Sequence, residues 1–174
     1  MKTRITGYHF TGNTLRNGEP IPKPGEWLVH TGPIVPCSSG LHASERVLDA
    51  LQYAPGPTLH KVILEGELQS HGDPIDKYVG RRRKILASID ATNLLRDFAR
   101  WCALSVIDKW NAPDVVRKYL TTGDEKLRDA AWDAARYAAR AAAGAAAWDA
   151  ARAAARDAQS KQLESMVKEA MKGL

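Results

Sequence analysis

The last third of the chain contains an alanine-rich repeat that constrains the fold more than any other feature of the sequence. From residue 130 to residue 155, the last two positions of every four-residue unit are alanine, and the units begin with Arg128, Trp132, Arg136, Arg140, Gly144, Trp148 and Arg152. Alanine has the highest helix propensity. A four-residue period drifts by roughly 40° per unit on a helix of 3.6 residues per turn, which disfavours a long coiled-coil seam. We therefore predict an alanine-rich helical tail over 123–174, either as one long helix or as a hairpin that bends at Gly144.

Three aromatic residues interrupt the alanines of this tail. Alanine faces allow helices to approach closely, but each face buries little apolar area. The tail is therefore expected to cover Trp132, Tyr137 and Trp148 as well, and copies of the chain can do this for one another. We predict a homo-oligomer that assembles through these three residues.

The residues before Gly123 have a different composition, since they hold nearly all the glycines, prolines and β-branched residues. Runs rich in β-branched and aromatic residues predict strands at 2–11, 27–30, 59–68 and 84–89. Helical spacing predicts helices at 44–54, with Ser44 as N-cap, at 91–110 and at 113–122. The predicted fold class is α+β: a small mixed or antiparallel sheet with packed helices over 1–122, followed by the helical tail.

The charge of the chain points to a local anionic contact. The net charge is +5, and the excess comes mainly from the consecutive residues Arg81, Arg82, Arg83 and Lys84. Arginine forks match oxyanions bidentately, so these four residues can bind an anionic ligand or partner, or they can be a solvated entrance to the following strand. A general nucleic-acid coat is not favoured by so modest a charge.

Cysteine usage and hydropathy bear on the location of the protein. Cys37 and Cys102 lie far apart and lack zinc-ligand spacing, which is typical of a reduced intracellular protein. Charges interrupt every apolar run, so neither a signal peptide nor a membrane span is predicted. We expect a cytoplasmic protein without a metal site.

Two short motifs in the first half of the chain resemble those of a known enzyme family. Gly7-Tyr8-His9-Phe10-Thr11 resembles the first-strand histidine motif of ADP-ribosyltransferases of the His-Tyr-Glu type. The segment 40–54, Gly-Leu-His-Ala-Ser followed by Ala-Leu-Gln-Tyr-Ala, is similar to their second motif, in which a tyrosine stacks on nicotinamide. The resemblance implies that His9 holds the NAD ribose and that Tyr53 is the stacking tyrosine. On this basis the predicted ligand-binding residues are His9, Thr11, His42, Ser44 and Tyr53, with NAD or an ADP-ribose derivative as ligand; the alternative is that His9, His42 and Tyr53 are ordinary packing residues.

One element of that family is missing from the sequence. The enzymes carry a glutamate on a later strand that stabilises the positively charged sugar during nicotinamide loss, but this chain has no glutamate between Glu67 and Glu125. Without such a carboxylate, the largest electrostatic contribution to catalysis would be absent. No catalytic residue is therefore assigned.

The whole chain also resembles phage and prophage proteins that join such a segment to an alanine-rich tail. The favoured function is a phage-type accessory protein, acting in the host cytoplasm against a host defence, that binds a nucleotide-like ligand without turnover. Two alternatives stay open: an active mono-ADP-ribosyltransferase that modifies a host protein, and a protein-binding inhibitor of a host defence protein that acts through the tail and Arg81–Lys84.

Overall fold

A computed structural model describes residues 2–141 and 149–174. The chain divides into two compact units, which are described separately: the first unit contains Met1–Thr92 together with Ser160–Leu174, and the second contains Asn93–Gln159. Strands are confined to the first unit and most helices belong to the second, so the predicted α+β class is confirmed. The two units divide at Thr92, whereas the sequence placed the boundary near residue 122.

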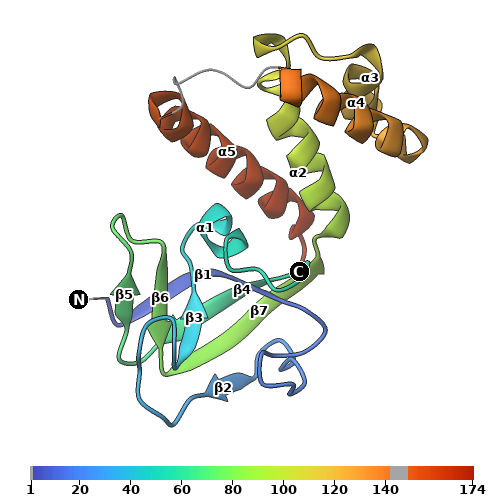
Figure 1. The fold of residues 1–174 in the computed structure, drawn as a ribbon. Coiled ribbons are helices and arrows are strands. Elements are labelled where there is room, and N and C mark those ends of the chain that lie inside the picture. The colour runs from blue at the N-terminus through green and yellow to red at the C-terminus, as the bar shows by residue number, and fades with distance from the viewer. Residues whose placement is uncertain (1, 142–148) are drawn as a thin grey trace. The chain divides into compact units, whose positions relative to one another are not determined.

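The first unit is built from two antiparallel sheets (Figure 1). The larger sheet has the order β1 (Arg4–Thr11), β4 (Thr58–Glu65), β7 (Arg82–Asp90), β2 (Trp27–Val29). The smaller sheet has the order β3 (Leu41–Ala43), β6 (Lys77–Gly80), β5 (Gln69–His71). The four strands of the larger sheet are those predicted from the sequence, and the predicted central strand, β4, lies between β1 and β7. The smaller sheet was not predicted.

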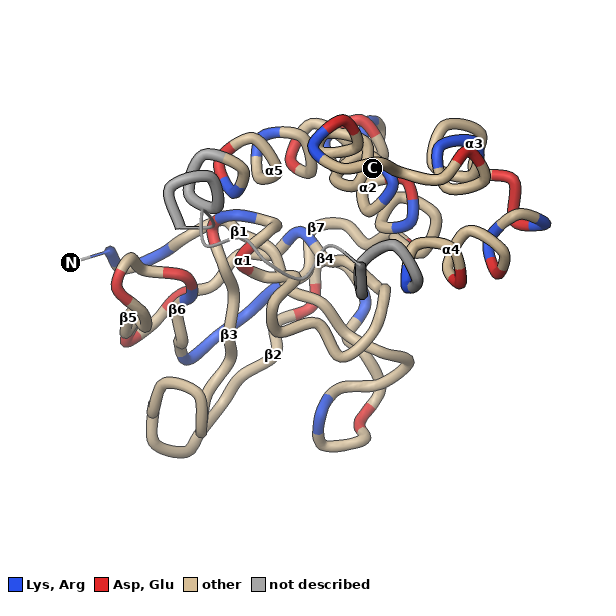
Figure 2. Tube along the Cα trace, turned by 45° about the horizontal axis from the view of Figure 1, so that its top comes forward, with Lys and Arg blue, Asp and Glu red and all other residues tan. Residues whose placement is uncertain are grey.

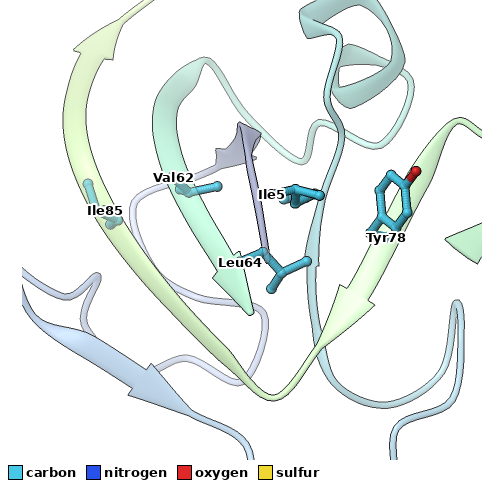
Figure 3. Close-up of a cluster of buried hydrophobic side chains, with 6 residues drawn as sticks. Ile5, Val62, Leu64, Tyr78 and Ile85 are labelled. Atoms are coloured by element: carbon cyan, nitrogen blue, oxygen red, sulfur yellow. The ribbon is translucent and has the colours of Figure 1, made fainter. Parts of the chain in front are cut away.

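The core of the first unit lies between the two sheets. Its buried side chains come from β1, β4 and β7 of the larger sheet and from β3 and β6 of the smaller one, and they are Ile5, Val62, Leu64, Ile85, Ala43 and Tyr78. Figure 3 shows the labelled members of this cluster pointing toward one another from facing strands. Because side chains alternate between the faces of a strand, this core fixes which residues of β1, β4 and β7 face the smaller sheet.

The predicted helix at 44–54 is shorter than expected. α1 spans Val47–Leu51, and its N-cap is Arg46 instead of Ser44. Ser44 cannot serve as N-cap because it pairs with Tyr8 of β1 through two backbone hydrogen bonds, of 2.7 and 3.0 Å. Tyr53 therefore lies in the turn after α1 and not on the helix itself.

Gly7 permits this close pairing between β1 and the residue before α1. A Cβ atom at position 7 would lie 2.4 Å from the Ser44 carbonyl oxygen, which accepts the hydrogen bond of the Tyr8 backbone N–H. Gly7→Ala is therefore expected to reduce the free energy of unfolding by about 2–3 kcal/mol, because backbone must move to relieve the overlap. Urea denaturation measures this effect. Gly12→Ala is the control, since its Cβ would meet no described atom within 4 Å, and an equal loss in both variants would contradict the steric explanation.

The second unit is helical where the structure describes it. Its elements are α2 (Thr92–Leu104), the 3-10 turn η1 (Ile107–Lys109), α3 (Asp114–Thr122), the 3-10 turn η2 (Glu125–Leu127), α4 (Arg128–Ala141) and the first part of α5 (Asp149–Ala170). The predicted end of α3 at Gly123 is confirmed, with the left-handed φ of 66° that favours glycine. The described core of this unit comprises Ile107, Ala112, Val116 and Ala131.

The residues predicted to drive oligomerisation belong to the tail. Trp132 lies on α4 and is 67% exposed, so its ring is free to be covered by another molecule. Tyr137 also lies on α4, but its side chain is outside the description, and Trp148 and Gly144 lie outside the described residues. Assembly through the tail stays a prediction, as does the choice between one helix and a hairpin at Gly144.

The end of the tail is part of the first unit. Leu163 and Val167 of α5 are completely buried. Arg46 Nε donates a hydrogen bond of 2.9 Å to Ser160 Oγ and lies 3.9 Å from Glu164 Oε1. The predicted appendage therefore ends in a helical segment that packs into the sheet-containing unit. Among the described helices, none is long and apolar enough to cross a membrane.

Candidate ligand-binding cavity

An open cavity of about 760 Å³ lies in the first unit. Its walls come from the C-terminal half of β1 and the loop that follows, from the end of β2, from the segment leading into β3, from β3 itself, from α1 and the turn after it, and from single residues of β6 and β7. All five predicted ligand-binding residues line it: His9, Thr11, His42, Ser44 and Tyr53. Residues up to 44 positions apart in the sequence are thus brought together, and the volume lies within the range of small-molecule sites.

Arg83 is a buried cation in the wall of this cavity. Its side chain is only 6% exposed, and its Nη1 donates a hydrogen bond of 2.8 Å to the His42 carbonyl oxygen. Within the described part of the chain, no carboxylate forms an ion pair with it. Burial lowers the pKa of Arg83 to about 10, so the guanidinium remains charged at neutral pH.

The predicted basic cluster, Arg81 to Lys84, has side chains that point to different surroundings. Figure 2 shows its blue stretch between β6 and β7. Arg81 pairs with Glu67 and also donates to two backbone carbonyls, while Arg82 pairs with Glu65. Lys84 lies 4.8 Å from the centre of the Trp27 ring. Since side chains alternate along β7, only Arg83 of the four enters the cavity, where Arg82 and Lys84 cannot reach.

A second buried cation, Lys77 of β6, contacts the predicted stacking residue. Lys77 is 7% exposed, and its Nζ lies 3.6 Å from the centre of the Tyr53 ring. The Tyr53 hydroxyl donates a hydrogen bond to Asp76, and this bond is the main reason why the pKa of Tyr53 is raised to about 12. Tyr53 is 47% exposed, so its ring is positioned on one side by Lys77 and remains accessible to a ligand.

Three histidines near the two cations are neutral at neutral pH. Burial, followed by the charges of Lys77 and Arg83, lowers the pKa of His42 to about 4. Burial and Arg83 lower the pKa of His60 to about 4, and burial with Arg83 lowers the pKa of His9 well below its ordinary value. The site therefore combines fixed positive charge with uncharged imidazoles.

The histidines differ in their hydrogen bonds. Thr11 Oγ1 donates to the Gly12 carbonyl oxygen at 3.0 Å, so it accepts from His60 Nε2 at 2.8 Å, and His60 Nδ1 then accepts from Ser88 Oγ at 2.7 Å. The hydrogen-bonding groups of the Thr11 and His60 side chains are thus paired within the protein, and these two residues hold the cavity wall in place. The ring of His9 has no hydrogen-bond partner among the described residues, and neither does the buried Nε2 of His42.

Protonation of His60 is expected to destabilise the fold at acid pH. His60 is 1% exposed, and its pKa is about 4 in the folded chain against an ordinary value near 6.5. The unfolded chain binds the proton first, so the stability contribution is complete above pH 6.5 and is lost as the pH falls toward 4, by up to about 3 kcal/mol. Urea denaturation between pH 7.5 and 4.5 should show a smaller loss in His60→Gln than in the wild type. Parallel pH profiles would contradict this assignment.

The sequence predicted an anionic contact for Arg83 as one of four adjacent basic residues, and it did not assign Lys77 or His60, which lies behind the Thr11 wall. The alternation of Arg83 with Ile85 places Arg83 on the core face of β7. His60 shares a face with Val62 by the same rule. Lys77 follows a Gly-Asp-Pro turn, on a strand too short for the sequence to indicate.

The part of the chain that forms the cavity matches the model of a known protein family. Residues 5–97, just over half of the chain, match the model of a family described as a domain of unknown function, DUF7666. The chain belongs to this family. Every residue that lines the cavity falls within the DUF7666 segment, which begins in β1 and ends in α2. Neither the curated proteins nor the solved structures contain a match to the chain.

Proposed function

We propose that the first unit binds a nucleotide-like ligand with phosphate groups, such as an ADP-ribose derivative, and does not turn it over. The observation that carries the proposal is the buried guanidinium of Arg83 in the wall of the cavity, without an ion-pair partner among the described residues. A buried charge is costly unless it is paired. An anionic ligand would supply the missing pair, and phosphate suits the planar donor fork of arginine.

The remaining groups fit the other parts of such a ligand. Tyr53 offers an exposed aromatic face for a base or a nicotinamide ring. His9 is neutral and has no described hydrogen-bond partner, so it can bond a ribose hydroxyl, in the role that the resemblance to ADP-ribosyltransferases implies. In this proposal the main contacts are Arg83, Tyr53 and His9, while Thr11 and Ser44 shape the wall.

The charges around the cavity support binding over transfer. Loss of nicotinamide from NAD builds positive charge on the ribose, and transferases stabilise it with a carboxylate. The described lining of this cavity includes the two buried cations, the exposed cation Arg16 and a single carboxylate, Glu19, which lies on the same exposed loop as Arg16. A positive charge that develops beside Arg83 and Lys77 would be destabilised. The resemblance to phage and prophage proteins extends the proposal to a role against host defence, in which the chain sequesters the ligand.

Calorimetric titration with ADP-ribose, combined with an assay for nicotinamide release from NAD, tests this function. Tyr53→Ala should weaken ADP-ribose binding by about 1–3 kcal/mol, the range for loss of base stacking. Tyr53→Phe keeps the ring and loses only the bond to Asp76, so it should bind nearly as well as the wild type. Both variants should fold, because Tyr53 is half exposed.

Three results would contradict the proposal. If no nucleotide binds, the proposed function is wrong. If Tyr53→Ala unfolds the first unit while Tyr53→Phe changes nothing, Tyr53 is a packing residue. If the wild type releases nicotinamide from NAD, the chain is an ADP-ribosyltransferase and not a binder.

A further inference from the structure

The contact between the Lys77 ammonium and the Tyr53 ring affects which kind of ligand ring can stack on Tyr53. The Lys77 ammonium lies 3.6 Å from the centre of the Tyr53 ring, well within the range of a cation–π contact. A flat ligand ring stacked on the opposite face of Tyr53 would lie about 3.5 Å from the Tyr53 ring. It would therefore lie roughly 7 Å from Lys77 Nζ. At that distance a buried charge still acts strongly on a charged ligand group, because little water lies between them.

The charges around Tyr53 do not cancel this effect inside the cavity. Lys77 is 7% exposed and forms no ion pair within the described chain, and Arg83 adds a second buried positive charge to the same wall. The carboxylate of Asp76 is in direct contact with Tyr53. It accepts a hydrogen bond from the Tyr53 hydroxyl and contacts His71 Nδ1 at 3.1 Å, so it lies at the edge of the ring and not over its face.

We propose that Lys77 is a specificity-determining residue, which makes the Tyr53 face accept neutral rings and reject cationic ones. The ligand class is thereby narrowed to phosphorylated nucleotides whose stacked ring is uncharged, such as adenine or reduced nicotinamide. The pyridinium ring of oxidised NAD is disfavoured. This inference rests on the proposed function of the cavity.

Reduced and oxidised nicotinamide mononucleotide provide a closely matched pair of probes, since each carries a single base ring and they differ in the charge and planarity of that ring. Calorimetry on the full chain should give at least ten-fold tighter binding of the reduced form. Lys77→Met should abolish most of this preference, mainly by strengthening the binding of the oxidised form. Lys77→Arg keeps the charge and should retain the preference, and Lys84→Met, which removes a lysine outside the cavity, should leave both affinities unchanged.

The outcomes separate this inference from the proposed function. Equal affinities of the wild type for the two forms, or tighter binding of the oxidised form, would overturn the role of Lys77 while leaving nucleotide binding intact. A preference that survives in Lys77→Met would arise from ring shape and would also overturn it. If neither form binds and ADP-ribose does not bind either, both the function and this inference are wrong.

Discussion

Replacing Arg83 with methionine is expected to weaken ADP-ribose binding at least 100-fold, which corresponds to about 2.7 kcal/mol. The guanidinium is buried in the cavity wall, and a phosphate that reaches it would form charge-assisted hydrogen bonds in a site with little competing water. Methionine keeps much of the length of the side chain but removes the charge. Isothermal titration calorimetry of the variant measures the loss directly.

The same strand supplies a matched control. Arg82→Met removes an identical charge one residue away, but Arg82 pairs with Glu65 on the other face of β7. The affinity of the Arg82→Met variant for ADP-ribose should stay within two-fold of that of the wild type. Thermal unfolding should show that Arg83→Met is as stable as the wild type or more so, because a buried charge without a partner is removed. Equal losses of affinity in the two variants would mean that the basic cluster acts only through its general charge.

The second large effect is expected in the helix that closes the chain. Leu163 of α5 is completely buried in the first unit, so Leu163→Ala should reduce the free energy of unfolding of that unit by about 2–5 kcal/mol. Hydrogen exchange of the β4 amides reports on this unit separately from the helical one. Ser165→Ala, at an exposed position on the same helix, should change stability by less than about 0.5 kcal/mol. Unchanged β4 exchange in Leu163→Ala would mean that the tail is a separate appendage.

Local patterns predicted most of the regular structure. Alternating and consecutive apolar residues identified all four strands of the larger sheet, and alanine content identified the helices of the tail. Strong local signals also marked boundaries, since Gly123 ends α3 and Asp124 accepts the Lys126 backbone N–H at the next turn. The smaller sheet escaped prediction because β3, β5 and β6 are three or four residues long and carry no run of three aromatic or aliphatic residues like that of β2, and because β3 pairs with β6, a distant segment.

The residues of the candidate cavity were predicted only in part, because some belong to local motifs and others depend on tertiary contacts. His9, His42 and Tyr53 belong to recognisable motifs, and the structure brings them to one cavity. Arg83 and Lys77 depend on tertiary context, because the same basic side chain is a solvated charge on one face of a strand and a buried cation on the other. Likewise, packing of the Leu163 segment into the first unit brings Arg46 and Ser160, 114 positions apart, into hydrogen-bond contact, which no local pattern encodes.

The central claim is that a phosphorylated nucleotide binds in the cavity beside neutral histidines. Long-range ¹H–¹⁵N correlation spectra of the imidazole rings, recorded during titration with ADP-ribose at neutral pH, test it most directly. The account predicts neutral ring signals for His9 and His42 that shift saturably at one ligand per chain. The signal of His71, which does not line the cavity, should stay in place. Unmoved His9 and His42 signals at saturating ADP-ribose, or shifts confined to His71, would contradict the account.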